Sequence, residues 1–201
     1  TDKCPGGWKD ILNQSDLVFV PYEGLRDVFS EAIDTPVETL YLPINKEYNW
    51  PTTEAMLTNN LPKKFTFSFN GTFSPHDRKG IVALLKAFGE TDWDVIFQVK
   101  SRSLPTVKDP RVVVTAQDLS VPALIGFYLK SHCGAYPSRG EGYGLPQIET
   151  SFLGRPLILA DNTGANWSSR HMPWKYMVPC TPGPAHYNHP SLGEDIGSWF
   201  Y

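Results

Sequence analysis

The feature that most restricts the fold of this chain is an alternation of strand-like and helix-like segments from Lys63 onward. Short runs of β-branched and aromatic residues are separated by segments whose apolar residues recur at helical spacing. We expect strands at Phe65–Phe69, Val95–Val99, Val112–Val114, Gly134–Tyr136 and Pro156–Ala160, and helices at Arg78–Glu90, from a cap at Asp118 or Ser120 to Leu129, and at Pro146–Leu153. This alternation predicts an α/β fold in which a parallel sheet carries helices on both faces.

A glycine-rich turn that follows the fourth expected strand is the strongest functional signal. Residues 137–149 read Pro-Ser-Arg-Gly-Glu-Gly-Tyr-Gly-Leu-Pro-Gln-Ile-Glu. Glycines let a ligand approach the backbone, and Pro146 suits the first position of a helix, whose free N–H groups favour an anion. Glu141 and Glu149 flank the turn and supply acceptors for hydroxyl groups. The turn therefore predicts a ligand with both phosphate and sugar, as in a sugar nucleotide.

The same segment resembles the donor-site motif of glycosyltransferase family 4, the retaining group 1 transferases of GT-B fold, in which two glutamates stand eight positions apart. A second match lies upstream, where Phe69-Asn70-Gly71-Thr72-Phe73 is followed by Arg78-Lys79-Gly80 and a helical pattern. It looks like the family's strand, phosphate loop and helix start. The resemblance implies a C-terminal donor-binding domain with a Rossmann-like sheet, which is one half of a GT-B enzyme.

The resemblance also implies roles for single residues. Lys79 would stabilise the departing diphosphate and Glu141 would face the hydroxyls of the donor sugar, so these two are the expected catalytic residues. Glu149 would bind the ribose hydroxyls. The expected donor-binding residues are Gly71, Thr72, Arg78, Lys79, Glu141, Gly142, Tyr143, Gly144, Leu145 and Glu149.

One residue departs from the family pattern. Thr72 stands where the family usually has an arginine that shares the diphosphate with the lysine. Either Arg78 or the hydroxyl and backbone of Thr72 would have to compensate. Arg78 and Lys79 could instead be a solvated pair that Asp77 neutralises, since a helix N-terminus disfavours cations by about 0.3–1 kcal/mol.

We expect residues 1–45 to be a remnant of an N-terminal domain, 46–62 to be a linker, and 63–201 to be a C-terminal domain truncated at its end. A strand, a helix and a second strand are expected at Leu17–Val20, Leu25–Ile33 and Leu40–Ile44. The start at Thr1, and an apolar end at Trp199-Phe200-Tyr201 with no element to bury it, favour a fragment. Such a fragment would be inactive alone, because two domains build a GT-B cleft.

Composition excludes several other functions. The net charge of −3 argues against a nucleic-acid binder, and any membrane contact would be peripheral, through the missing domain. Three scattered cysteines favour the cytoplasm. No metal or other cofactor is expected, because His186 and His189 have no evident acidic or cysteine partner. The nucleotide base is expected near residues 116–119, where Asp118 is interpreted as a helix cap.

The sequence leaves the function open among three alternatives. The first is retaining transfer of a sugar from a nucleotide donor to the hydroxyl of a glycan, lipid or protein acceptor. The second is another GT-B reaction, such as that of an epimerase or a phosphorylase. The third is a catalytically silent domain that binds sugar nucleotides or mediates assembly, and the threonine at position 72 is its best support.

Overall fold

A six-stranded sheet forms the larger part of the protein, for which the computed structural model describes residues 2–44, 50–51, 61–74, 76–104, 106–185 and 197–201. Its strand order is β5-β4-β3-β6-β7-β8, and every neighbouring pair is parallel. The strands are β3 (Thr66–Asn70), β4 (Ile96–Lys100), β5 (Val112–Thr115), β6 (Cys133–Tyr136), β7 (Leu157–Ala160) and β8 (Lys175–Val178). The predicted α/β fold with a parallel sheet is confirmed.

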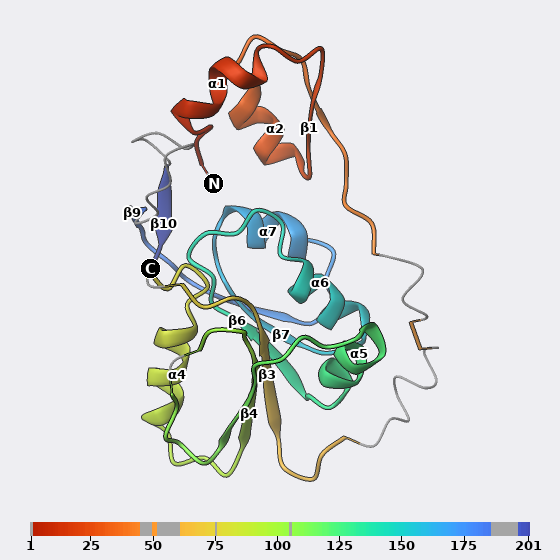
Figure 1. The fold of residues 1–201 in the computed structure, drawn as a ribbon, viewed down its shortest axis with the longest axis vertical. Helices are drawn as coiled ribbons and strands as arrows, with labels where there is room; N and C mark the ends of the chain where they lie inside the picture. Colours follow the sequence, from red (N-terminus) through yellow and green to blue (C-terminus); the bar gives the residue numbers. More distant parts are fainter. Residues whose placement is uncertain (1, 45–49, 52–60, 75, 105, 186–196) are drawn as a thin grey trace.

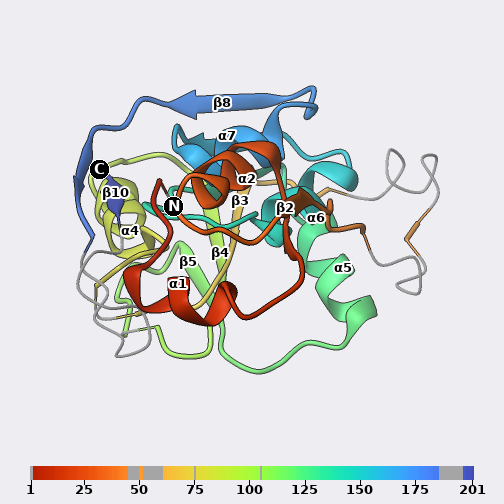
Figure 2. The ribbon, with the colours of Figure 1, turned by 90° about the horizontal axis from the view of Figure 1, so that it is seen from above.

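Helices cover both faces of this sheet (Figures 1 and 2). Helix α4 (Ile81–Gly89) lies on one face, and α5 (Val121–Leu129) and α6 (Leu145–Phe152) lie on the other, while α7 (Thr163–Ser169) lies above the upper edge of the sheet in Figure 1. Strand β4 shows the two faces directly, because successive side chains of a strand point in opposite directions. Phe97 packs against Phe88 of α4 with ring centroids 5.5 Å apart, whereas Gln98 donates to the Phe127 carbonyl of α5 at 2.7 Å.

A smaller unit precedes the sheet. It consists of α1 (Gly6–Leu12), β1 (Val18–Val20), α2 (Glu23–Ser30) and β2 (Val37–Thr39), with β1 and β2 parallel. A strand at Leu40–Ile44 was the wrong expectation: Val37 is the residue that pairs with Val18 and is buried, while Leu40 is 57% exposed. Tertiary pairing, rather than the apolar run, decides which residues form the strand. Most of the expected linker, residues 46–62, lies outside the described residues.

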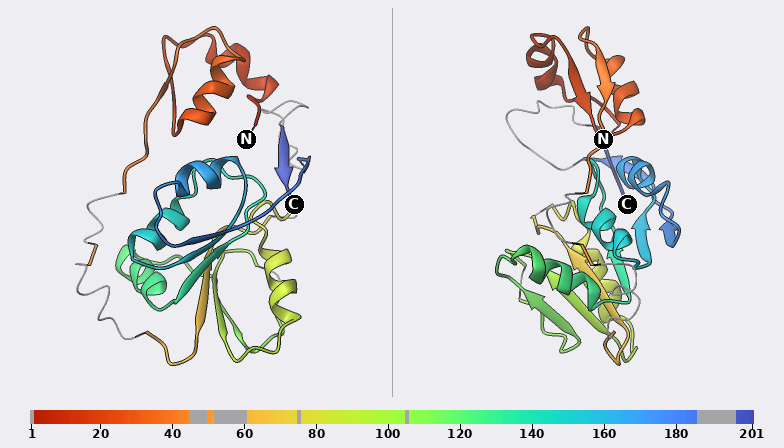
Figure 3. Two further views of the ribbon diagram at one scale, coloured as in Figure 1. Left: turned by 180° about the vertical axis from the view of Figure 1, so that it is seen from behind. Right: turned by 90° about the vertical axis from the view of Figure 1, so that its right-hand side faces the viewer.

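The small unit rests on the larger one through α7 and the glycine-rich turn. Tyr22 stacks on Trp167 with ring centroids 5.8 Å apart, and Arg170 pairs with Glu23 at 3.0 Å. The Tyr143 hydroxyl of the turn donates to the Leu42 carbonyl at 3.4 Å. Figure 3 shows the unit above the edge of the sheet where the turn lies.

The expectation that Trp199-Phe200-Tyr201 have no element to bury them was wrong. Strand β10 (Ser198–Phe200) pairs antiparallel with β9 (Pro182–Pro184), and Trp199 is only 5% exposed. The Phe200 amide donates to the Arg139 carbonyl at 2.8 Å. This hairpin therefore packs on the glycine-rich turn.

Helix α4 begins at Ile81, three residues later than expected, so Arg78 and Lys79 lie in the preceding turn. Asp77 and Gly80 both have positive φ, 49° and 70°, which is incompatible with a helix there. The Asp77 carboxylate accepts from the amides of Val82 at 3.0 Å and Ala83 at 3.3 Å. It therefore satisfies two of the free N–H groups at the start of the helix. Its ion-pair partner is Arg139, whose Nη2 lies 3.6 Å from the carboxylate, rather than Arg78 or Lys79.

Candidate functional site

The order of the strands creates one point on the sheet where a ligand site is favoured. The chain leaves β3 through α4 towards β4 and β5, then returns through α5 to β6 and continues to β7 and β8. Strands β3 and β6 are therefore neighbours from which the chain departs in opposite directions. In open α/β sheets, ligands bind beyond the carboxyl ends of two such strands. We call this place the switch point.

Both sequence motifs lie at the switch point. The loop from Gly71 to Gly80 follows β3, and the glycine-rich turn follows β6. Gly80 fixes the two loops against each other, because a Cβ on this residue would lie 2.0 Å from the Pro137 carbonyl oxygen. The amide of Arg139 also donates to the Arg78 carbonyl at 2.8 Å. The two loops therefore form one surface.

Lys79 and Glu141, the two residues expected to be catalytic, form an ion pair across this surface. Their side chains are only 19% and 11% exposed. A buried pair of this kind is costly to desolvate and is strongly destabilised when one partner is removed. Next to the pair lies a cavity of about 10 Å³, which is about the volume that one water molecule needs. Its lining includes Asn70 and Gly144.

Arg78 contacts the backbone of the turn rather than the open surface. Its Nη1 donates to the Gly140 carbonyl at 2.7 Å. This contact holds the turn in place, and it occupies one donor of the guanidinium that the sequence analysis considered as a substitute for the missing arginine. Thr72 is exposed at the end of β3, while the Gly71 amide donates to the Lys100 carbonyl at 3.1 Å.

The glycine-rich turn ends at Gly144, a residue with a left-handed backbone that directly precedes α6. Gly144 has a φ of 83° and occupies the N-cap position, so Pro146 is the second helical residue rather than the first. Leu145 is 46% exposed, and Gly142 is exposed with open space around its Cα. The backbone of the turn is thus accessible at Gly142. Tyr143, by contrast, packs against the core of the N-terminal unit.

Glu149, unlike Glu141, lies on a helix, in the first turns of α6. Its Oε2 accepts from the Tyr128 hydroxyl at 2.7 Å, and that hydroxyl accepts from Asn70 Nδ2, also at 2.7 Å. Burial raises the pKa of Glu149, and the hydrogen bond from Tyr128 offsets part of this rise. Glu141 and Glu149 therefore differ in environment, the first paired with a cation and the second with a neutral hydroxyl.

We predict that Glu149→Gln raises the stability of the protein at neutral pH. A carboxyl with a raised pKa in the folded state stabilises the fold below its unfolded pKa, and this contribution is lost as the pH rises through the folded pKa. At pH 7 the melting temperature of the variant should exceed that of wild type, by about 2–4 °C for each kcal/mol gained in the free energy of unfolding. The difference in melting temperature should vanish near pH 4. Thermal unfolding between pH 4 and pH 8 measures this, with the exposed Glu90→Gln as control. A constant difference across this range would contradict the prediction.

Asn70 and Tyr128 are site residues that the sequence analysis missed. Tyr128 follows Leu124, Ile125 and Phe127 in an apolar helix, so the pattern placed it in the core. It is indeed fully buried, but its hydroxyl reaches the switch point. The chemistry of tyrosine could have indicated this role, because a buried tyrosine usually has a hydrogen-bond partner for its hydroxyl.

The region expected to read the base contains a charged cluster. Asp118 does not cap α5, whose N-cap is Ser120. It forms two hydrogen bonds with Arg102, at 2.7 and 2.8 Å, and lies 3.7 Å from Lys100 Nζ. Because Lys100 is the last residue of β4 and Arg102 follows it, this cluster lies at the same edge of the sheet as the switch point. Neither cation was among the residues expected at the site from the sequence.

No group of three or more His, Cys, Asp or Glu side chains within the described parts of the chain is suited to hold a metal ion. His186 and His189 lie outside those parts. None of the helices that the structure describes is long and apolar enough to span a bilayer.

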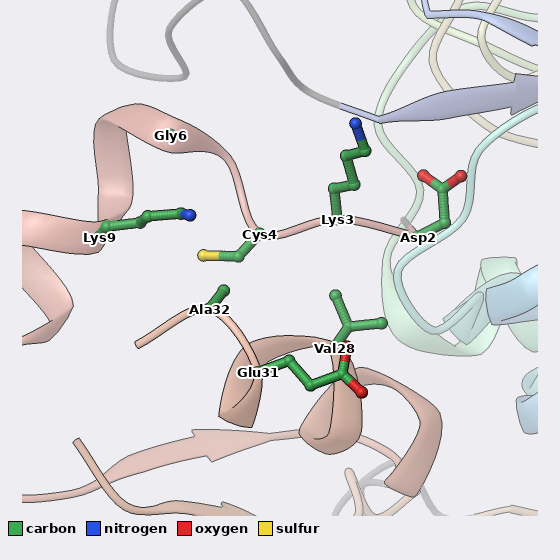
Figure 4. Close-up of a pocket in the computed structure, with 8 residues that line it drawn as sticks. All are labelled: Asp2, Lys3, Cys4, Gly6, Lys9, Val28, Glu31 and Ala32. Carbon is green, nitrogen blue, oxygen red and sulfur yellow. The ribbon is translucent and has the colours of Figure 1, made fainter. Parts of the chain in front are cut away.

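Two larger cavities lie away from the switch point. One, of about 350 Å³ in the N-terminal unit, is shown in Figure 4, and its lining combines Lys3 and Lys9 with Asp2 and Glu31. Burial raises the pKa of the Cys4 thiol in this cavity, and Lys9 offsets part of the rise. The other, of about 270 Å³, is apolar and lies between α4 and the sheet. Neither cavity is lined by residues of the two loops that meet at the switch point.

Comparison with known proteins supports the fold. No protein-family model matches the chain, and no curated protein sequence matches it. Among solved structures, sucrose-phosphate synthase from Thermosynechococcus elongatus matches 85% of the chain and 47% of its own length at 20% identity and a TM-score of 0.66. The UDP-forming α,α-trehalose-phosphate synthase from Burkholderia vietnamiensis matches 85% and 50% at 12% identity and a TM-score of 0.62. HepE from Anabaena, solved with UDP and glucose, matches 78% and 48% at 14% identity and a TM-score of 0.57.

These similarities show that the chain has the fold of a half of a GT-B glycosyltransferase. The chain spans about half the length of each of the three structures. At identities of 12–20%, the similarity concerns the fold, and the residues of the site have to carry any argument about function.

Proposed function

We propose that this domain binds a nucleoside-diphosphate sugar at the switch point and serves as the donor-binding half of a retaining glycosyltransferase of the family 4 type. The observation that carries the proposal is the ion pair between Lys79 and Glu141 at the carboxyl ends of β3 and β6. Each partner suits a different part of the donor. A cation favours the diphosphate, and a carboxylate accepts hydrogen bonds from sugar hydroxyls.

In this proposal, binding of the donor separates Lys79 from Glu141 and gives each of them a new partner on the donor. The diphosphate replaces Glu141 beside Lys79, and the released carboxylate faces the hydroxyls of the sugar. Lys79 then stabilises the negative charge that develops on the leaving nucleoside diphosphate as the glycosidic bond breaks, which is an electrostatic contribution to catalysis. The exposed residues Gly142 and Leu145 supply further backbone contacts to the donor, and the buried Gly144 lines the small cavity beside the ion pair.

Glu149 binds the ribose in the same proposal. It is separated from Glu141 by the length of the turn, and it lies on the helix rather than in the loop. A donor that extends from the sugar at Glu141, past Lys79, to the ribose at Glu149 would use both acidic residues. The base would then lie towards Lys100, Arg102 and Asp118. No metal or other cofactor is required, and the acceptor is left open among glycans, lipids and proteins.

The proposal extends to the whole protein. We expect the 201-residue chain to bind donor without transferring sugar, because the matched structures are about twice as long and an acceptor needs a second surface. The proposed location is the cytosol, where free thiols such as Cys4, Cys133 and Cys180 persist. Sugar transfer by the chain alone would refute the first expectation.

A silent binding or assembly domain is the second candidate. The exposed Thr72 and the contact of Arg78 with Gly140 favour it, since both leave Lys79 as the main cation for the diphosphate. Calorimetric titration of the chain with UDP, GDP and ADP and their glucose derivatives tests donor binding. Saturable binding with one preferred base supports the proposal, and no binding to any of the six refutes it. Retained anomeric configuration in the product of a longer, active form would separate transferase from silent domain.

A further inference from the structure

The Tyr128 hydroxyl lies between the two parts of the candidate site. Asn70, at the end of β3, donates to it at 2.7 Å, and it donates to Glu149 of α6 at 2.7 Å. Asn70 also lines the small cavity beside Lys79 and Glu141. A continuous path of hydrogen bonds therefore runs from the cavity beside the ion pair to the carboxylate proposed for the ribose.

The direction of each hydrogen bond in this path is determined. A phenol has one proton, and the amide of Asn70 occupies a lone pair of its oxygen. The proton of Tyr128 consequently points to Glu149. Of the hydrogen bonds between described residues, those of the Glu149 carboxylate involve Oε2 alone. Oε1 is left to accept from a ligand.

The tyrosine ring itself is rigidly held. Tyr128 is fully buried, and its ring packs edge-on against Phe127 with centroids 5.7 Å apart. Ser131 Oγ donates to the Tyr128 carbonyl at 2.7 Å and accepts from Ser68 Oγ of β3 at 3.0 Å. The hydroxyl therefore has a fixed position relative to the end of β3.

We propose that Tyr128 is a positioning residue for ribose recognition: its hydroxyl, oriented by Asn70, holds Oε2 of Glu149 so that Oε1 faces the ribose hydroxyls. This inference rests on the proposed function and adds two residues to it. Neither residue contacts the reacting atoms. Their effect on the ligand passes through the carboxylate.

A measurement without ligand tests the contact between Tyr128 and Glu149. The titratable groups that face Glu149 are Tyr128 from α5 and Tyr136 from β6. The titration midpoint of Glu149 can be followed by NMR on protein labelled with ¹³C in its glutamate carboxyls, with Glu149→Gln identifying the signal. Tyr128→Phe removes a donor to the ionised carboxylate, so it should move the midpoint to higher pH. An unchanged midpoint would overturn the proposal.

A second measurement tests the consequence for ribose. For the base that binds best, the affinity of the nucleoside diphosphate is compared with that of its 2′,3′-dideoxy analogue. Wild type should prefer the ribose form, and Tyr128→Phe should reduce this preference by about tenfold, the value of one hydrogen bond to a charged group. Glu149→Gln should reduce it too, and the double variant should show no further loss.

The outcomes separate this inference from the proposed function. A Tyr128→Phe protein that keeps the full preference for ribose, or that weakens both nucleotides equally, would show a purely structural role and overturn the inference. If wild type bound no nucleotide, the proposed function would fail, and the midpoint of Glu149 would still decide the positioning role. Should Tyr128→Phe not fold, Asn70→Ser removes the orienting amide without changing the buried ring. A smaller shift of the midpoint to higher pH is then expected, because the hydroxyl keeps its proton and loses its orientation.

Discussion

Replacement of Lys79 by alanine is expected to weaken the binding of nucleoside diphosphates by about 30-fold to more than 1,000-fold. Removing one member of a buried charge pair from a binding site costs about 2–5 kcal/mol, and each 1.4 kcal/mol corresponds to a factor of ten. In this site Lys79 is the cation that faces Glu141 across the switch point, and its side chain is only 19% exposed. The neighbouring cation, Arg78, is bound to the Gly140 carbonyl and would have to move to replace this charge.

Lys86→Ala is the matched control for this experiment. Lys86 lies on α4, the helix that begins just after Lys79, and it is exposed. The control makes the same change in net charge, so a general electrostatic effect would appear in both variants. Calorimetric titration of the two should show loss of affinity with Lys79→Ala and a change below about twofold with Lys86→Ala. Equal losses in the two variants would mean that the diphosphate does not bind at Lys79.

Gly80→Ala is expected to destabilise the protein by more than about 3 kcal/mol, which combines a left-handed backbone cost of about 1–2 kcal/mol with a steric overlap. Gly80 has a φ of 70°, and its Cβ would lie 2.0 Å from the Pro137 carbonyl oxygen. The melting temperature should fall by about 6–12 °C. Since the overlap is with backbone, the two loops must move apart, and nucleotide binding should fall as well.

The same helix provides a matched control for this glycine. Gly89 ends α4 and has open space where its Cβ would be. Gly89→Ala should be neutral or stabilise the protein by up to about 1 kcal/mol. Thermal unfolding of both variants gives the comparison. A Gly80→Ala protein as stable as wild type would show that the close contact between the two loops is not required.

Five of the six strands of the sheet could be predicted from the sequence because they are local signals, whereas the edge strand β8 was not expected. Segments such as Phe65–Phe69 and Pro156–Ala160 are short, apolar and flanked by polar or glycine-rich residues, and each lies within one residue of an observed strand. Alternation with helices then implies parallel pairing, because a crossover helix is the usual connection between parallel strands. The carboxyl-end location of the glycine-rich turn follows from the same reasoning.

Features that depend on contacts between distant residues could not be predicted. The start of α4 is set by Asp77, which adopts positive φ and caps the helix from outside it. Trp199 is buried because its strand pairs with Pro182–Pro184, a segment whose sequence has no strand pattern. Asp118 is paired with Arg102 from another loop, although its local sequence suits a helix cap.

The charged residues of the candidate site could be predicted from the sequence, but the residues that hold them in place could not. Lys79, Glu141 and Glu149 stand out as charged residues in glycine-rich or helix-start contexts. Tyr128 fits the apolar pattern of α5 as well as phenylalanine would, and Asn70 is one polar residue at the end of a strand. Only the packing of α5 on β3 and α6 brings their polar atoms within 2.7 Å of each other.

Hydrogen–deuterium exchange of the chain, with and without a saturating nucleoside diphosphate, tests the central claim most directly because it locates the ligand on the fold. We predict slower exchange in the loop after β3, in the turn before α4 and in the glycine-rich turn before α6, with β8 and α1 unchanged. Protection confined to the N-terminal unit or to the apolar cavity beside α4, or no protection in any segment, would contradict a nucleotide site at the switch point.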